Sequence, residues 1–322
     1  MNKALRTIYT AACFLMMAIP THAQTKITIG GGPYLDVPQI SVAMDKNLWA
    51  GEGLEANIVA FRSGRDAFEA LLGGQLDFAL MAEFPAVIGA MRDQKFSIIA
   101  EMSQYTATRI IHTGDDSVKT VADLAGKPIG TTTGTNVHFM LENELALAGV
   151  KAEIVSVGPP DIVAALSRGD IFGAAMFPSF YAGAKKTLGD RYKEISVSSY
   201  GTHFILVATA NMINDNPDVV SGVLRALYNG EKVVTSDPTE SHAAVSRVIS
   251  GTLKPDEVAA ASKNYSFRMG LDNDLVKLMV QEGEWIHARG SIKGDKPTVV
   301  LMRGFVAGQF LSGIDASRVN LD

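Results

Sequence analysis

Three segments of the chain recur roughly a hundred residues later, in the same order. The matched pairs are Ile29-Gly30 with Ile129-Gly130, residues 53–59 with 149–155, and residues 70–81 with 165–176. Ordered matches indicate an internal duplication, although any two units of strand and helix share some likeness. Two copies are too few for a solenoid, and 322 residues are too many for one ordinary core. The pattern therefore predicts two lobes.

Each copy alternates short β-rich runs with apolar stripes at helical spacing. The predicted strands are 26–30, 57–61 and 78–82 in the first copy and 127–131, 153–157 and 173–177 in the second. The predicted helices are 38–50, 66–72, 137–148 and 161–168. This alternation predicts an α/β fold in which each lobe is a mostly parallel sheet flanked by helices, with right-handed crossovers.

The last third of the chain is predicted to be mostly helical. Residues 218–234 and 272–288 carry the apolar stripes of long helices, which we expect to pack on the first lobe. The apolar runs 109–112 and 204–209 flank the second copy and predict strands that cross between the lobes. The predicted division is lobe 1, residues 24–108 plus 208–322, and lobe 2, residues 109–207.

The first 23 residues have the pattern of a secretory signal peptide. Lys3 and Arg6 precede an apolar run over 11–19, and Ala23 ends a cleavage site of small residues. This predicts an exported, periplasmic protein, with free secretion as the alternative. The one cysteine, Cys13, lies inside the apolar run, where it is badly placed for a lipid anchor. Cleavage leaves no cysteine, which excludes a disulfide scaffold and a thiolate metal site.

Charge and motifs narrow the function further. The net charge of −5, with no basic run, argues against nucleic acid as a partner. The sequence contains no nucleophile elbow, P-loop, His-Glu-x-x-His or dinucleotide-binding glycine motif. His138 and His203 stand alone rather than in a cluster. We therefore predict no enzyme activity, no cofactor and no metal site.

Candidate ligand contacts lie in the loops after the predicted strands. Ligands of open α/β sheets bind beyond the carboxyl ends of strands, close to helix N-termini. The loops at such ends are 30–34, 62–65, 82–85, 131–136, 158–160 and 177–179. Hydroxyl and N–H groups over 133–136 suit an anionic or polar group, although this segment also has the pattern of a turn with a helix cap.

Several single residues allow two interpretations. Glu83 either offsets the dipole of the helix that follows it or faces the cleft and accepts from a ligand N–H group. In the second case the ligand carries an anionic or carbonyl end and an amino or ring N–H group. Arg65 is expected to be a solvated residue of a first helical turn, and Trp285 to lie in the core. Glu142 is expected on an outer helix face.

Several strings resemble a known family. They are Phe61-x-x-Gly64 with Ala70-Leu71-x-x-Gly74-x-x-Asp77, the run 121–130, Gly134-Thr135-Asn136-Val137-His138, Pro159-Pro160-Asp161, and Ala165-Leu166-x-x-Gly169-Asp170-Ile171. Together they resemble the nitrate/sulfonate/taurine-binding and thiamine-pyrimidine-precursor-binding family of ABC-transporter substrate-binding proteins. The resemblance covers nearly the whole mature chain and is strongest over 53–178.

The resemblance implies a fold and a function. The expected fold is the two-lobed periplasmic binding protein fold of type II, with two crossover hinge segments. The expected function is capture of a small polar or anionic organic solute (sulfonate, taurine-like or pyrimidine-like) by a monomer that delivers it to an inner-membrane ABC permease with its ATPase. The alternatives are a periplasmic enzyme on the same scaffold, or a binding protein for a non-ABC transporter or a sensor.

The resemblance also implies ligand contacts at matching positions, to which Tyr200 is added as an apolar wall. The predicted contact residues are Gly32, Pro33, Tyr34, Glu83, Phe84, Thr133, Thr135, Asn136, Phe177, Pro178 and Tyr200. The chain departs from the family at two of them. Many relatives carry Trp near position 177, and sulfonate-binding relatives mostly carry a small polar residue where this chain has Glu83. Both departures argue against a plain sulfonate or nitrate as the ligand.

Overall fold

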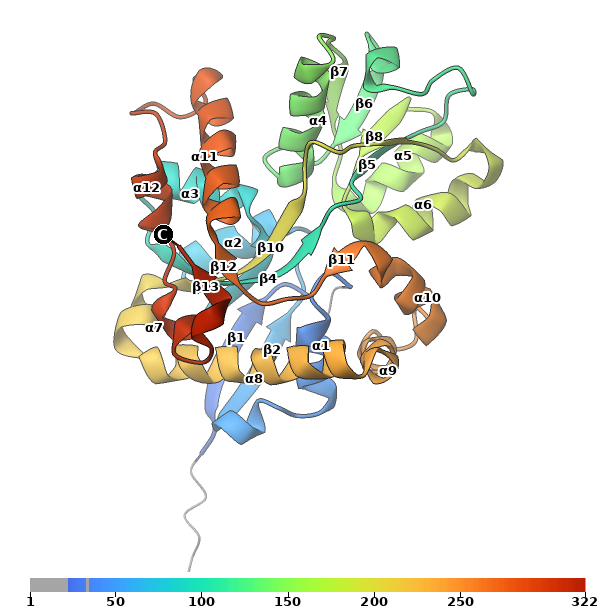
Figure 1. Cartoon of the computed structure of the whole chain (residues 1–322). Helices are drawn as coiled ribbons and strands as arrows, with labels where there is room; N and C mark the ends of the chain where they lie inside the picture. Colours follow the sequence, from blue (N-terminus) through green and yellow to red (C-terminus); the bar gives the residue numbers. More distant parts are fainter. Residues whose placement is uncertain (1–22, 33–34, 322) are drawn as a thin grey trace, which may run out of the picture.

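The computed structural model describes residues 23–32 and 35–321 of the chain. The predicted signal peptide up to residue 22 and the predicted contacts Pro33 and Tyr34 lie outside the described residues. The described chain forms two large sheets, each flanked by helices, in two lobes (Figure 1). We call the part around the first sheet lobe 1 and the part around the second sheet lobe 2. The predicted two-lobed α/β architecture is confirmed.

The two sheets are assembled on the same plan. Lobe 1 has the order β11-β4-β10-β3-β1-β2, with β1 (Thr25–Gly30), β2 (Leu54–Val59), β3 (Phe78–Ala82), β4 (Phe96–Tyr105), β10 (Thr202–Thr209) and β11 (Tyr265–Ser266). Lobe 2 has the order β7-β6-β8-β5-β9, with β5 (Arg109–His112), β6 (Pro128–Thr131), β7 (Glu153–Ser156), β8 (Gly173–Ala175) and β9 (Lys193–Ser196). In each sheet one inserted strand, β10 or β5, is antiparallel to both of its neighbours. The other long strands of each sheet share one direction.

The pairing register confirms the duplication. Ile29 lies between Ile58 and Phe78, and its counterpart Ile129 lies between Ile154 and Gly173. The strand orders β2-β1-β3-β10-β4 and β7-β6-β8-β5-β9 correspond position by position. The repeat in the sequence is therefore a repeat of one βα unit in three dimensions.

Close packing explains why glycine recurs at the end of the central strand. A Cβ added at Gly30 would lie 2.2 Å from Leu76 Cδ1, and one added at Gly130 would lie 2.5 Å from Ile171 Cδ1. Real Cβ atoms do not approach so closely, so the side chain that leads into the third strand of each copy fills the space that glycine leaves. The matched Gly and Leu or Ile positions are thus one packing interaction made twice.

The helices cover the sheets and build the tail. Lobe 1 carries α1 (Pro38–Asp45), α2 (Gly64–Leu72), α3 (Phe84–Met91), α7 (Ala210–Asp215), α8 (Pro217–Ser236), α9 (Pro238–Val248), α10 (Pro255–Ala261), α11 (Asn273–Ala288), α12 (Val299–Arg303) and α13 (Gln309–Ser312). Lobe 2 carries α4 (Asn136–Leu147), α5 (Ile162–Arg168) and α6 (Tyr181–Leu188). The two long tail helices are confirmed by α8, which packs on α1, and α11, which packs on α3. Within the described residues, no helix is both long enough and apolar enough to span a bilayer.

One helix is shorter than predicted. The pattern over 38–50 predicts a single helix, but α1 ends at Asp45. Asn47 takes a left-handed backbone conformation, with φ of 51°, which a right-handed helix cannot contain. The following residues instead form a 3₁₀ turn over Ala50–Glu52.

The chain passes between the lobes in two short segments. It leaves the first sheet after β4 and enters the second at β5, through residues 106–108. It returns through residues 197–201 to β10, which pairs with β3 and β4 along its length. Residues 202–207 therefore lie in the sheet of lobe 1, so the return crossing comes several residues earlier than the predicted boundary.

Candidate functional site

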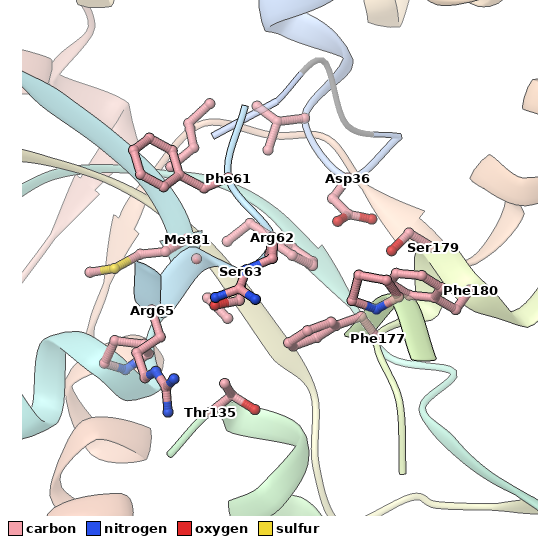
Figure 2. A pocket seen from close by; sticks show the side chains of 17 residues that line it. Asp36, Phe61, Arg62, Ser63, Arg65, Met81, Thr135, Phe177, Ser179 and Phe180 are labelled. Atoms are coloured by element: carbon pink, nitrogen blue, oxygen red, sulfur yellow. The ribbon is translucent and has the colours of Figure 1, made fainter. Parts of the chain in front are cut away.

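A cavity of about 380 Å³ lies between the two lobes (Figure 2). Its lining from lobe 1 comprises Asp36, Val37, Phe61, Arg62, Ser63, Gly64, Arg65, Leu80, Met81, Ala82, Pro85 and Phe204. Its lining from lobe 2 comprises Thr135, Pro160, Phe177, Ser179 and Phe180. Because both lobes contribute, a molecule in this cavity contacts both at once.

The carboxyl ends of parallel strands supply much of the lining, as the sequence predicts. Phe61 comes just after β2, Met81 lies near the end of β3, and Phe177 follows β8. Figure 2 shows the rings of Phe61 and Phe177 on different sides of the cavity. Such side chains give the middle of the cavity an apolar character suited to a hydrocarbon body.

Arginines lie at one end of the cavity, beside the N-terminus of α2. Ser63 caps this helix, because its hydroxyl accepts from the Asp66 N–H at 3.2 Å. Arg65 Nη1 donates to the Thr133 carbonyl oxygen at 2.7 Å and so joins lobe 1 to lobe 2. The expectation that Arg65 is merely solvated is wrong. Arg62 and Arg65 lie 3.7 Å and 3.6 Å from the Asp66 carboxylate, and Arg65 also lies 3.7 Å from Glu69, so an anion at this end meets guanidinium groups whose charge is partly offset.

Asp36 lies at a different end of the cavity, apart from Arg65 in Figure 2. Its side chain is buried, and its Oδ1 accepts from the Tyr265 hydroxyl at 2.5 Å. Burial raises the pKa of Asp36 to about 6, although the hydrogen bond from Tyr265 acts in the opposite direction. The cavity thus has an acidic end and a basic end.

Of the predicted contact residues that the structure describes, Thr135 and Phe177 line the cavity. Thr133 and Pro178 are not among the lining residues, although the Thr133 carbonyl accepts from the lining residue Arg65. Gly32 is buried and is not among the lining residues.

Four further predicted contacts also lie outside the cavity lining: Glu83, Phe84, Asn136 and Tyr200. Glu83 is fully buried, and its carboxylate accepts from the Tyr200 hydroxyl and, at 2.9 Å, from the His203 N–H. Its side chain makes no cap hydrogen bond to α3. Glu83 is thus the N-cap residue of α3, as the dipole interpretation requires, but its carboxylate bonds to Tyr200 and His203 rather than facing the cavity.

A second carboxyl, from α11, accompanies Glu83. Glu282 is 0% exposed, and neither of its carboxyl oxygens accepts a hydrogen bond from an N–H group of the described residues. Burial, together with the negative charge of Glu83, raises the pKa of Glu282 well above its ordinary value. Burial and the same charge also raise the pKa of Tyr200. The raised pKa favours the protonated form of Glu282.

Aromatic rings surround this carboxyl pair and connect the lobes. Phe139 of α4 stacks on Phe84 of α3 at 5.7 Å, and it meets Trp285 of α11 edge-on at 5.5 Å. The Tyr200 ring lies 5.8 Å from the Phe139 ring. The sequence predicts Trp285 in the core, but it is only partly buried and packs against the core. We call this set (Glu83, Phe84, Phe139, Tyr200, Glu282 and Trp285) the packed half of the interlobe interface, and the cavity with its lining the cavity half.

The prediction for Glu142 is wrong. Its side chain is only 12% exposed, and it forms ion pairs with Arg289 of α11 and, at 3.6 Å, with His138. Arg289 also lies over the Trp285 ring at 4.3 Å. Since α11 belongs to lobe 1 and α4 to lobe 2, this face of α4 is covered by the other lobe rather than exposed to solvent.

The side chains that line the cavity can recognise a ligand by its charge and its shape. Among the residues described, no cluster of three or more His, Cys, Asp or Glu side chains could hold a metal ion. Sequence reasoning included the loops of Arg62, Arg65 and Pro160 but did not select these residues as contacts. It missed Asp36, Phe180 and Phe204 as lining residues, because no motif marks them.

Comparison with known proteins identifies the family to which the chain belongs. The sequence pattern of the family described as NMT1/THI5 like matches residues 36–241. The chain belongs to this family. A protein of Brucella abortus (strain 2308) that is named as a binding protein is 24% identical over 245 residues, which are 74% of this chain and 74% of that protein. The taurine-binding periplasmic protein of Escherichia coli (strain K12) is 26% identical over 207 residues, covering 61% of this chain and 63% of that protein.

Solved structures share the fold. The periplasmic aliphatic sulphonate binding protein of Escherichia coli superimposes with a TM-score of 0.72 at 18% identity, over 87% of this chain and 97% of that one. The periplasmic nitrate-binding protein of Synechocystis PCC 6803 gives a TM-score of 0.71 at 12% identity, over 91% and 89% of the two chains. The family resemblance and the periplasmic binding protein fold are thereby confirmed.

Proposed function

We propose that this member of the family is the solute-binding component of an ABC importer. It captures a small organic solute between its lobes and delivers it to a membrane permease with its ATPase. The observation that carries this proposal is the interlobe cavity, lined by Phe61 and Arg65 from lobe 1 and by Thr135 and Phe177 from lobe 2. A solute bound there contacts both lobes, so its binding energy favours the closed arrangement.

Binding without catalysis fits the lining better than an enzyme does. The described lining contains the hydroxyls of Ser63, Thr135 and Ser179 but no histidine that could activate them. Ser63 Oγ is used as a helix cap, and Thr135 Oγ1 donates to the Thr132 carbonyl at 2.6 Å. Neither hydroxyl is arranged as a nucleophile beside a base.

The site of action is the periplasm, and the protein acts as a monomer. The pattern of residues 1–23 supports export with cleavage after Ala23, and named relatives are periplasmic. N-terminal sequencing of the exported protein should begin at Gln24. Retention of Met1, or lipid attached to Cys13, would contradict export by this route.

The direct test is release of the natural solute. Protein purified from its own periplasm is denatured, and the released small molecules are identified by mass spectrometry. We expect one organic solute in stoichiometric amount, which rebinds in titration calorimetry and makes the protein more compact in X-ray scattering. Rebinding with chemical turnover of the solute would favour the enzyme alternative, and absence of any bound solute together with unchanged scattering would contradict the proposal.

A further inference from the structure

Asp36 is a buried carboxylate at the cavity wall with no cation of the protein beside it. It is 6% exposed, and the structure records no ion pair between it and a lysine, arginine or histidine within the described residues. Its recorded side-chain hydrogen bond comes from Tyr265, a neutral group. Buried charges in proteins are normally paired. Here the cavity itself is the place from which a pairing cation can come.

The groups around Asp36 hold it in this position. The Tyr265 hydroxyl on β11 orients Oδ1, and the Ser103 hydroxyl on β4 donates to the Asp36 backbone carbonyl. Tyr105, also on β4, is the other titratable group close enough to influence this carboxylate. None of these groups neutralises it. A pKa of about 6 is the expected consequence of burial without a cation, and a bound ammonium would lower it.

Positive charge lies at the other end of the cavity. Arg62 is 80% exposed along its side chain, and its Nε lies 3.7 Å from the Asp66 carboxylate. Arg65 donates to the Thr133 carbonyl, which holds its guanidinium at the junction of the lobes, and the same guanidinium lies 3.6 Å from the Asp66 carboxylate and 3.7 Å from the Glu69 carboxylate. In Figure 2 the Arg65 guanidinium and the Asp36 carboxylate lie on different sides of the cavity. A solute that meets both needs an acid group at one end and a cation at the other.

The space between the two ends is apolar. Phe61, Met81, Phe177, Phe180 and Phe204 line it. A nitrate ion or a short amino acid would leave much of a cavity of about 380 Å³ in contact with no solute atom. A ring or a branched hydrocarbon would fill that space, and an ammonium beside phenyl faces gains further attraction.

We propose that Asp36 is the ammonium-recognising residue of the cavity and that the solute is an amino-bearing organic acid with an aromatic or bulky apolar body. The acid group lies at Arg62 and Arg65, the body lies among the phenylalanines, and the amino group pairs with Asp36. This assignment rests on the proposed function, because it names the solute class of the same cavity. It moves the acceptor that the sequence suggested at Glu83 to a residue that does line the cavity.

The test uses two probes that differ in one group. Titration calorimetry compares 4-(aminomethyl)benzenesulfonate with 4-methylbenzenesulfonate on the wild-type protein, with taurine as a probe that lacks the ring. We expect the amino probe to bind tenfold or more tightly than the methyl probe, and taurine to bind more weakly than the amino probe. Asp36→Asn should abolish the preference, so that the variant binds the amino probe no more tightly than the methyl probe. Asp218→Asn, at an exposed position in the first turn of α8, is the matched control and should retain the preference.

The outcomes separate the two proposals. Equal binding of both probes by the wild-type protein, or a preference that persists in folded Asp36→Asn, overturns the assignment of Asp36 and leaves the binding function intact. If Asp36→Asn does not fold, the comparison of the two probes on the wild-type protein tests the assignment of Asp36. The natural solute released from the protein is a second test, because a solute without an amino group also overturns that assignment. If neither probe binds and the purified protein releases no solute, the solute-binding function itself fails.

Discussion

The cavity half and the packed half of the interlobe interface occupy similar positions between the lobes, but one contains a cavity and the other is filled by side chains. Both lie where strands of lobe 1 and lobe 2 end face to face. In the cavity half Arg65 reaches across to the Thr133 carbonyl. In the packed half Phe139 of lobe 2 contacts Phe84 and Trp285 of lobe 1. One half leaves space for a molecule, and the other fills the same kind of space with protein.

The difference comes from the tail of the chain. Helix α11 lies outside the duplicated units and packs against α3 (Figure 1). Its Trp285 and Arg289 contact Phe139 and Glu142 of α4. It therefore covers the strand ends on its own side of the interface. A duplicated βα unit produces two facing sets of strand ends, and the appended helix determines which part of that cleft remains available for a ligand.

The largest expected effect is Phe139→Ala. Phe139 is 4% exposed, and its ring contacts Phe84, Trp285 and Tyr200, so its removal leaves a hole at the centre of the packed half. We expect the free energy of unfolding to fall by about 3–5 kcal/mol. Urea denaturation followed by circular dichroism measures it.

Phe177→Ala is the matched control from the cavity half. The Phe177 ring is only partly buried and lines the cavity, so its loss should change the free energy of unfolding by less than about 1 kcal/mol while weakening solute binding. Similar losses of stability in both variants would mean that the two halves are not distinct.

The second prediction concerns Glu83→Ala. The change removes the acceptor of the Tyr200 hydroxyl and of the His203 N–H, and it also relieves the repulsion on Glu282. We expect a net loss of roughly 1.5–3 kcal/mol in the free energy of unfolding, because buried hydrogen bonds to a charged group are lost. Solute affinity should stay within about threefold, as Glu83 does not line the cavity. Calorimetry showing a tenfold loss of affinity in a folded variant would restore Glu83 as a ligand contact.

Most of the fold could be predicted from the sequence, because the patterns that determine its strands and helices lie within short segments of the chain. The recurrence of Gly30 and Gly130 reports a packing contact with Leu76 or Ile171 that lies within each repeat. The early end of α1 was not readable, because the pattern of apolar residues continues past Asn47 while the backbone does not.

The candidate site could be predicted only in part, because its geometry depends on contacts between residues that are far apart in the sequence. Loop position identified Thr135 and Phe177, but it could not distinguish them from Glu83 and Phe84, which lie outside the lining. That distinction depends on where α11 packs, and its Glu282 and Trp285 are far from both loops in sequence. The bond from Arg65 likewise reaches a carbonyl 68 residues away. Asp36 carries no motif, so only the cavity reveals it.

The third prediction uses the buried carboxyl pair. The pKa of Glu282 is raised in the folded protein by burial and by Glu83, so the folded state keeps a proton that the unfolded chain releases near the ordinary glutamate value of 4.5. Stability from this group is therefore complete below that pH and is lost as the pH rises through the folded pKa, at about 1.4 kcal/mol per pH unit while the two states differ by one proton.

Glu282→Gln keeps the shape of the protonated side chain and cannot ionise. We expect it to become progressively more stable than the wild-type protein as the pH rises above 4.5, with little difference below. Urea denaturation at a series of pH values measures the difference. Parallel stability curves for the two proteins would show that Glu282 is not the buried acid described here.

The smallest expected effect is Glu142→Ala, which also tests how independent the two halves are. His138 and Arg289 hold the pKa of Glu142 below its ordinary value despite its burial, so its contribution is present at neutral pH and is lost as the pH falls through the folded pKa. Arg289 is about half exposed, and solvent screening limits the pair to about 0.5–1 kcal/mol of unfolding free energy. Glu153→Ala, at an exposed position without a recorded ion pair, is the control and should leave stability unchanged.

The solute affinity of Glu142→Ala shows whether the packed half stays in contact or opens when the lobes move. If α4 and α11 stay in contact in both the open and the closed protein, loss of the ion pair affects both states equally and the affinity does not change. If the contact forms only when the lobes close, the same loss disfavours the closed state alone and lowers the affinity by up to about fivefold, the equivalent of 1 kcal/mol. We expect the first result, because the packed half buries Glu83 and Glu282 completely, and opening it would expose apolar rings together with an acid pair. Titration calorimetry on this variant distinguishes the two, and a reduced affinity would make the packed half part of the closing movement.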